Sequence, residues 1–165
     1  FDAITSNTDD YWPAEMRDDI EEVNARIYDT VNNGVYKSGF ATTQAAYDAA
    51  VAPLFDTLDW LEARLGEGRY LMGDKMTEAD WRLWTTLVRF DNVYHLHFKC
   101  NRKRIVDYPN LWGFTRELYQ VAGVAETVNM NHIVRHYHYS HDTINPHRII
   151  PINPQLDFME PHGRG

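Results

Sequence analysis

Apolar residues recur every three or four positions through most of this 165-residue chain, which is the spacing of a helix with one buried face. The spacing is clearest over residues 42–66, where Leu54, Leu58 and Leu65 fall on one stripe. The same period predicts further helices over residues 13–32, 77–96, 111–121 and 129–139. No segment alternates with the period of two that is typical of strands, and no internal repeat is present. The predicted fold class is therefore all-α.

Residues 77–96 carry the strongest helical signal. Thr77 and Asp80 match a capping box, in which the Asp80 carboxylate accepts from the Thr77 amide and the Thr77 hydroxyl accepts from the Asp80 amide. Behind this cap, apolar side chains cover nearly the whole circumference, from Trp84 to Leu96. A helix that is apolar on all sides is a buried one. We therefore expect this segment to be the central helix of one globular domain.

Proline, asparagine and glycine mark the ends of the other helices. Pro13 suits the first turn of the first helix. The Asn-Asn-Gly run at residues 32–34 favours a left-handed stop, so residues 35–41 are expected to be a short connector. Pro53 lies inside the second helix and is expected to bend it. Residues 66–75 are predicted to form a loop with a hairpin-like turn.

The last 26 residues, 140–165, differ from the rest because they contain four prolines and little periodicity. They predict an extended, irregular tail. Several isoleucines make this tail too apolar to be disordered, so we expect it to pack along the helices. Residues 1–12 have the composition of a linker. The predicted division is thus a linker over 1–12, a helical domain over 13–139 and a packed tail over 140–165.

Composition narrows the function classes. Lys and Arg number 16 and Asp and Glu number 24, so the net charge is 16 − 24 = −8. An acidic chain without a basic stripe argues against a nucleic-acid partner. No apolar run reaches the length of a membrane span, which predicts a soluble, cytoplasmic protein with no membrane partner. The single cysteine, Cys100, allows no intrachain disulfide and suits a reducing compartment.

The eight histidines and Cys100 raise two chemical hypotheses. His132 and His136 could share a helix face, with His138, His141 and the His95-x-His97 pair as further ligands. No thiolate or carboxylate at a metal-site spacing completes such a set, so packed or solvated imidazoles and no metal are the favoured interpretation. Lysine and arginine around Cys100 could stabilise a thiolate. No nucleophile signature surrounds it, which favours a small buried residue.

The tyrosines are the more suggestive candidates. Tyr36 lies in NNGVYKSGFA and Tyr137 in HYHYSH, and a phenol hydroxyl can donate to a developing oxyanion or orient a phenolic substrate. On the residues alone, both a structural and a catalytic role stay open for each, and the structural one is favoured. Trp60, Trp81 and Trp84 are interpreted as core residues.

Several stretches of the chain resemble one known family. A capped, buried helix beginning Thr77-x-x-Asp80 is similar to the core helix of the glutathione transferase C-terminal domain. The chain further resembles the glutathionyl-hydroquinone reductases, the xi class of that superfamily, in five stretches that occur in order. These are residues 32–41 (NNGVYKSGFA), 97–101 (HFKCN), 107–113 (DYPNLWG), 136–152 (HYHYSHDTINPHRIIPI) and the ending 160–164 (EPHGR).

This resemblance implies a glutathione transferase C-terminal-like helical bundle and a glutathione-dependent oxidoreductase. Family members carry a catalytic cysteine in a Cys-Pro-Trp-Ala motif on an N-terminal thioredoxin-like domain, which also binds glutathione as co-substrate. The chain lacks that motif, and Cys100 does not correspond to it. By itself the chain is therefore expected to be inactive, with residues 1–12 as the linker from the missing domain.

For the helical domain, the resemblance implies a hydroquinone pocket and a homodimer contact. Two tyrosines of that pocket hydrogen-bond the oxygens of the glutathionyl-hydroquinone, and they match Tyr36 and Tyr137. Tyr139 competes with Tyr137 within the same motif, so it is kept as a substrate-binding candidate. Two alternative functions stay open: a stand-alone helical interaction module without catalysis, and a metal-binding helical protein built on the histidines.

Overall fold

The computed structural model describes residue 4 and residues 8–165, so the predicted linker over 1–12 lies partly outside the described residues. Every regular element among the described residues is helical, which confirms the all-α class. The elements are η2 (Ala14–Met16), α1 (Arg17–Ile27), η3 (Tyr28–Asn32), α2 (Gly34–Gly39), α3 (Gln44–Glu67), α4 (Glu78–Arg89), η4 (Phe90–Tyr94), α5 (His95–His97), η5 (Ile105–Asp107), α6 (Pro109–Tyr119), η6 (Ala125–Thr127) and α7 (Met130–Ser140).

The expected stop at residues 32–34 is wrong. The helical path continues through η3, which is one π-helical turn, and directly into α2. Asn33 is right-handed helical at φ −87° and ψ −26°. Val31 and Val35, one turn apart, are both fully buried, and their burial outweighs the weak Asn-Gly stop signal. Tyr36 is consequently on a helix and not in a connector.

The α2–α3 corner depends on one close approach. A Cβ atom at Gly39 would lie 2.2 Å from Cδ1 of Phe98, a separation that real side chains do not reach. Only glycine lets this end of α2 sit against the Phe98 ring. Thr43 then caps α3, accepting from the amide of Ala46 at 3.2 Å. Pro53 lies within α3.

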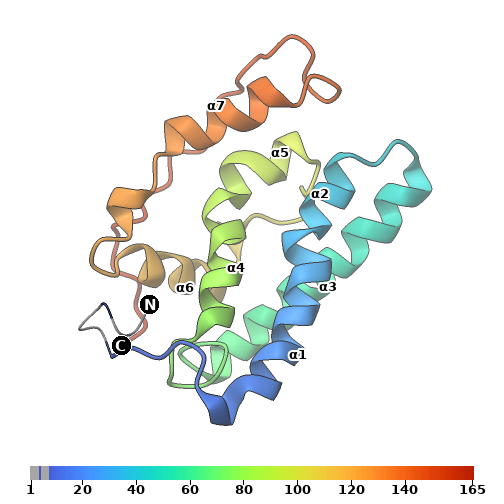
Figure 1. The fold of residues 1–165 in the computed structure, drawn as a ribbon. Helices are drawn as coiled ribbons and strands as arrows, with labels where there is room; N and C mark the ends of the chain where they lie inside the picture. Colours follow the sequence, from blue (N-terminus) through green and yellow to red (C-terminus); the bar gives the residue numbers. More distant parts are fainter. Residues whose placement is uncertain (1–3, 5–7) are drawn as a thin grey trace.

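Helix α4 occupies the middle of the molecule, in contact with α1 and α6 (Figure 1). Its predicted capping box is confirmed. The buried Asp80 carboxylate accepts from the amides of Thr77 at 2.7 Å and Leu71 at 2.9 Å, which ties the preceding loop to the helix. The indole of Trp84 donates to the Thr115 carbonyl on α6 at 3.0 Å. Leu96 departs from the prediction, because 56% of it is exposed.

After α4, a π-helical turn (η4) and α5 lead to α6 and α7. Asn129 caps α7 by accepting from the amide of His132 at 3.0 Å. The irregular tail then turns back and runs beside α7 toward α6 (Figure 1). Phe158 is buried against Tyr119, whereas Ile152 is fully exposed, so the tail packs through only part of its apolar residues.

The predicted hairpin-like turn is present as two isolated bridges, Tyr70 with Gly73 and Met72 with Lys75. Glu117 of α6 joins this turn to the tail. Its carboxylate accepts from Arg69 at 2.7 Å and from Arg164 at 3.1 Å. Within the described part of the chain, each helix is either too short or too polar to cross a lipid bilayer.

Candidate functional site

Three tyrosine hydroxyls that lie far apart in the sequence meet at one point. Tyr36 of α2 and Tyr137 of α7 have hydroxyl oxygens 2.6 Å apart. Tyr94, the last residue of η4, has its hydroxyl oxygen 2.8 Å from that of Tyr137. The structure therefore brings together the two sequence-predicted tyrosines and adds a third.

Phe98 supports all three rings. The Tyr94 ring stacks on Phe98 with centroids 5.5 Å apart, and Tyr36 lies 5.2 Å from it at a tilted angle. Tyr137 meets Tyr94 edge to face at 5.4 Å. Such ring contacts fix orientation as well as burying area. The hydroxyl geometry is thus held by an aromatic cluster at the junction of α2, η4, α5 and α7.

Tyr94 is the last residue of the π-helical turn η4. Asp91 of this turn accepts from the amides of Ile105 at 2.7 Å and Val106 at 3.1 Å, so the turn is anchored to η5. π-helical turns inside α-helices occur frequently at functional sites. Sequence reasoning placed Tyr94 only among the apolar residues around the central helix. No motif marks it, because only the fold brings its hydroxyl beside that of Tyr137.

The three hydroxyls differ in exposure, which gives the cluster a preferred polarity. Tyr94 is 2% exposed, Tyr137 7% and Tyr36 37%. A buried hydroxyl must donate within the protein, because an unmade hydrogen bond there is costly. Either hydroxyl of each pair could donate, and the arrangement in which both buried hydroxyls donate within the protein has Tyr94 donating to Tyr137 and Tyr137 to Tyr36. We infer this arrangement, which leaves the Tyr36 proton available to donate outward. Burial raises the pKa of Tyr137 to about 12 and that of Tyr94 further, so both stay protonated at neutral pH.

The cluster forms one end of an open pocket of about 710 Å³. The pocket is lined by Tyr28, Asn32, Asn33, Tyr36, Glu78, Trp81, Arg82, Thr85, Thr86, Arg89, Tyr94 and Tyr137. We call it the tyrosine pocket. Its two arginines differ: Arg82 is paired with Glu78, whereas no carboxylate of the described residues pairs with Arg89. The charge of Arg89 acts on Tyr137, lowering its pKa against the larger effect of burial.

The other sequence candidates lie outside this pocket. Tyr139 is 41% exposed and stacks under the guanidinium of Arg135, 5.1 Å from the ring centroid. Cys100 is fully buried, and burial raises the pKa of its thiol to about 12, so it is a packed residue and not a thiolate. Trp84 is a core residue as predicted, while the half-buried Trp81 lines the tyrosine pocket.

Three of the histidines, His97, His138 and His141, lie close together. His97 Nε2 and His141 Nδ1 are 3.0 Å apart, and the His97 ring lies 4.7 Å from that of His138. His138 also bonds the Val134 carbonyl through Nδ1 at 2.9 Å. No group of three or more histidine, cysteine or acidic residues within the described ranges has an arrangement that could hold a metal ion. The favoured interpretation of packed imidazoles fits His97 and His138.

Comparison with known proteins gives this geometry a context. Residues 44–117 match the family described as glutathione S-transferase, C-terminal domain. The chain is 60% identical over 164 residues to the glutathionyl-hydroquinone reductase YqjG of Escherichia coli, covering 99% of this chain and 50% of the relative. It is 54% identical to the glutathionyl-hydroquinone reductase PcpF of Sphingobium chlorophenolicum, covering 93% of this chain and 49% of that protein.

Solved structures agree with the sequence relatives. The glutathione-bound structure of YqjG from Escherichia coli superposes with a TM-score of 0.98 over 99% of this chain and 53% of that one, at 60% identity. A xi-class glutathione transferase from Natrialba magadii gives a TM-score of 0.97 at 49% identity, over 99% of this chain and 50% of that one. The chain spans about half the length of the curated relatives it matches. The chain is similar in sequence and fold to these proteins over about half of their length, and residues 44–117 match the C-terminal domain of the glutathione S-transferases.

Proposed function

We propose that this chain is the helical, substrate-binding half of a glutathionyl-hydroquinone reductase. The observation that carries the proposal is the Tyr36–Tyr137–Tyr94 hydroxyl cluster, which opens on a pocket large enough for a hydroquinone ring. It lies in a chain 60% identical to a reductase of that name. Phenol donors are suited to phenolic oxygens, which is the chemistry a hydroquinone presents.

In the proposed reaction, a cysteine thiolate on a thioredoxin-like domain attacks the thioether sulfur of the glutathionyl-hydroquinone. The carbon–sulfur bond breaks, its electron pair goes to the ring carbon, and that carbon takes a proton to give the free hydroquinone. The enzyme is left as a mixed disulfide with glutathione. The thiolate of a second glutathione attacks this disulfide, which releases glutathione disulfide and restores the cysteine thiolate.

The residues of this chain would bind and orient the ring. Tyr36 donates its outward proton to a hydroquinone oxygen, and Tyr137 sustains that donation from behind. As charge moves into the ring during carbon–sulfur cleavage, a fixed donor stabilises the oxygen without reorganising. The Arg89 guanidinium, which has no carboxylate partner among the described residues, adds positive charge that acts on Tyr137. Tyr139 stays a predicted substrate-binding residue, with its ring outside the tyrosine pocket.

The wider organisation is proposed with the function. A thioredoxin-like domain would precede a linker over residues 1–12, with the helical domain over 13–139 and the tail over 140–165. Glutathione would bind mainly to the thioredoxin-like domain, and no metal would be needed. A cytoplasmic location is supported by the free, buried thiol of Cys100, which suits a reducing compartment.

A homodimer through the helical domain is part of the proposal. Leu96 is 56% exposed, Ile149 67% and Ile152 100%, and Leu96 and Ile149 line one surface groove. Exposed apolar area of this kind is typical of interaction surfaces. Light scattering of the full-length protein should give twice the protomer mass, and Ile149→Lys should shift it toward the monomer. A monomeric native protein would contradict the dimer.

The decisive test uses the full-length protein and a glutathionyl-hydroquinone with excess glutathione. Tyr36→Phe and Tyr137→Phe should each lower kcat/KM by about tenfold to a hundredfold, because the first removes the donor to the developing charge and the second removes the hydroxyl that sustains it. Tyr70→Phe is the matched control, since it also removes a hydroxyl hydrogen bond, to the Glu117 carboxylate at 2.8 Å, and lies outside the tyrosine pocket. Turnover that is the same in all three variants would remove the assigned role. A native protein that neither binds nor reduces the conjugate would favour the interaction-module alternative.

A further inference from the structure

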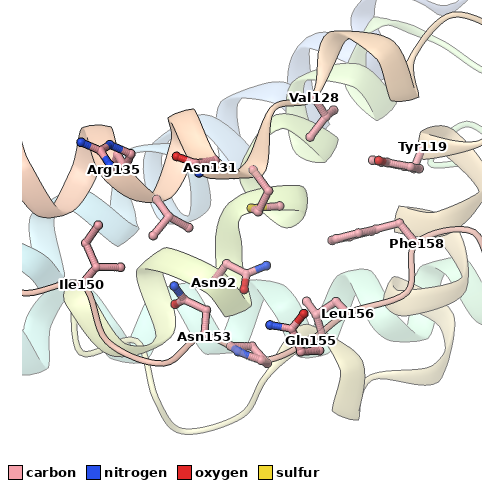
Figure 2. A pocket seen from close by; sticks show the side chains of 13 residues that line it. Asn92, Tyr119, Val128, Asn131, Arg135, Ile150, Asn153, Gln155, Leu156 and Phe158 are labelled. Carbon is pink, nitrogen blue, oxygen red and sulfur yellow. The ribbon is translucent and has the colours of Figure 1, made fainter.

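A second cavity shares no lining residue with the tyrosine pocket. It has a volume of about 460 Å³ and is enclosed by α7, the returning tail, η4 and the end of α6 (Figure 2). We call it the tail cavity. Small-molecule sites in proteins commonly have volumes of about 300–1,000 Å³ with mostly apolar walls and a few placed polar groups. The tail cavity has this size, and nothing in the proposed reaction uses it.

Asn92 is the polar group at its base. The residue is 5% exposed, and its carboxamide makes no hydrogen bond with any described residue. Figure 2 shows this side chain between α7 and the tail segment, inside the ring of lining residues. Buried amides are normally paired with protein or with water. The Asn92 carboxamide has no protein partner among the described residues and lines the cavity, so its hydrogen-bonding groups are available to a molecule bound there.

The other residues that line the cavity indicate what kind of molecule would fit. Val134, Leu156 and Phe158 give apolar and aromatic walls. Asn131, Asn153 and Gln155 add carboxamides near the opening, and Arg135 adds a cation. No acidic side chain of the described residues lines the cavity. Carboxamides donate to carbonyl and phenolate oxygens and accept from hydroxyls, so they suit oxygen-bearing rings.

We propose that the tail cavity is a second ligand site, which binds a flat aromatic molecule of one or two rings carrying hydroxyl or carbonyl oxygens. The ring lies between Val134 and Phe158, and an oxygen bonds the carboxamide of Asn92. The site is separate from the tyrosine pocket, and the proposal does not depend on the proposed reductase activity.

The position of the cavity gives its occupant a structural effect. Asn92 and Tyr94 belong to the same π-helical turn, and Val134 lies one turn before Tyr137 on α7. The two elements that carry the buried tyrosines therefore also line the tail cavity. A ligand there bridges α7, η4 and the tail, which stabilises the folded chain by binding linkage.

The test uses 6-bromo-2-naphthol, a two-ring phenol, with the full-length protein. Calorimetric titration gives affinity and stoichiometry, and anomalous scattering from bromine in soaked crystals gives the position. Asn92→Leu keeps the side-chain size while removing the carboxamide. Leu156→Trp fills the cavity from the tail and leaves η4 unchanged, so a folded variant is available even if the first fails to fold. Asn101→Leu makes the same change at an exposed asparagine.

We expect bromine in the tail cavity, binding about tenfold weaker in Asn92→Leu through loss of the buried hydrogen bond, and little binding there in Leu156→Trp. Asn101→Leu should bind as the native protein does. The proposal would be overturned by bromine found only in the tyrosine pocket, by no binding at all, or by an affinity in both cavity variants equal to that of the native protein. None of these results depends on turnover, so a failure here leaves the proposed function to its own assay.

Discussion

At the scale of single residues, the proposed chemistry depends on Tyr137 and its two neighbours. The Tyr137 hydroxyl contacts the other two hydroxyls, so it links the buried hydroxyl of Tyr94 to the more exposed hydroxyl of Tyr36. Tyr36 and Tyr137 could be predicted as site residues from the motifs that resemble the family. Tyr94 could not be predicted, because only the folded chain places its hydroxyl beside the other two. A buried tyrosine within an apolar helix gives no sign in the sequence of which way its hydroxyl points.

Arg89 offers a residue-scale prediction. Its guanidinium is the pocket cation without a carboxylate partner in the described part of the chain, and its charge favours negative charge on phenolic oxygens nearby. Arg89→Gln should lower kcat/KM for glutathionyl-hydroquinones by about tenfold, whereas Lys75→Gln, which removes one exposed cation, should not. Steady-state kinetics at low and high salt would check this. An equal effect of both changes would mean that only net charge matters.

At the scale of elements, local signals predicted most of the helices. Thr43, Asn129 and the Thr77 capping box each begin a helix where expected. The prediction of a helix stop was wrong between α1 and α2, where the π-helical turn η3 continues the helical path through the Asn-Asn-Gly run. A C-terminal Asn-Gly signal is only a preference, whereas full burial of a valine side chain contributes about 1.5–3 kcal/mol, and two valines are buried here. The tail's path was equally unpredictable, since it depends on contacts with distant helices.

The capping box of α4 gives the element-scale prediction. Asp80 is fully buried and accepts from two backbone amides, one of them from the preceding loop. Asp80→Ala leaves both amides unpaired and should destabilise the domain by about 2–4 kcal/mol. Asp74→Ala, at an exposed turn, should cost less than about 0.5 kcal/mol. Chemical unfolding of the two variants would measure the difference, and similar midpoints would refute the role of the box.

At the scale of the whole molecule, the domain is joined by a few polar contacts between distant segments. Glu117 links the hairpin-like turn, α6 and the tail, and His97 and His141 join α5 to the start of the tail. Burial lowers the pKa of His97 from 6.5 to about 4, with His138, His141 and Lys99 adding to the shift. The folded chain therefore holds His97 neutral where an unfolded chain would protonate it.

This difference has a definite sign. Between about pH 6.5 and pH 4 the unfolded state binds more protons at His97 than the folded state does, so stability is lost as the pH falls through this window. The free energy of unfolding should decline over that range, and His97→Gln should flatten the decline. Urea unfolding at a series of pH values would measure it, with the exposed His132→Gln as the control. An unchanged slope in His97→Gln would assign the pH dependence to other groups.

The contact between Gly39 and Phe98 also bears on how sequences with this fold can vary. A methyl group at position 39 would overlap the Phe98 ring, and that ring supports all three tyrosines. The two positions can therefore change only together. A natural relative with alanine at the first is expected to carry a smaller side chain at the second, and such a pair would mark a lineage whose tyrosine cluster has been rebuilt or lost.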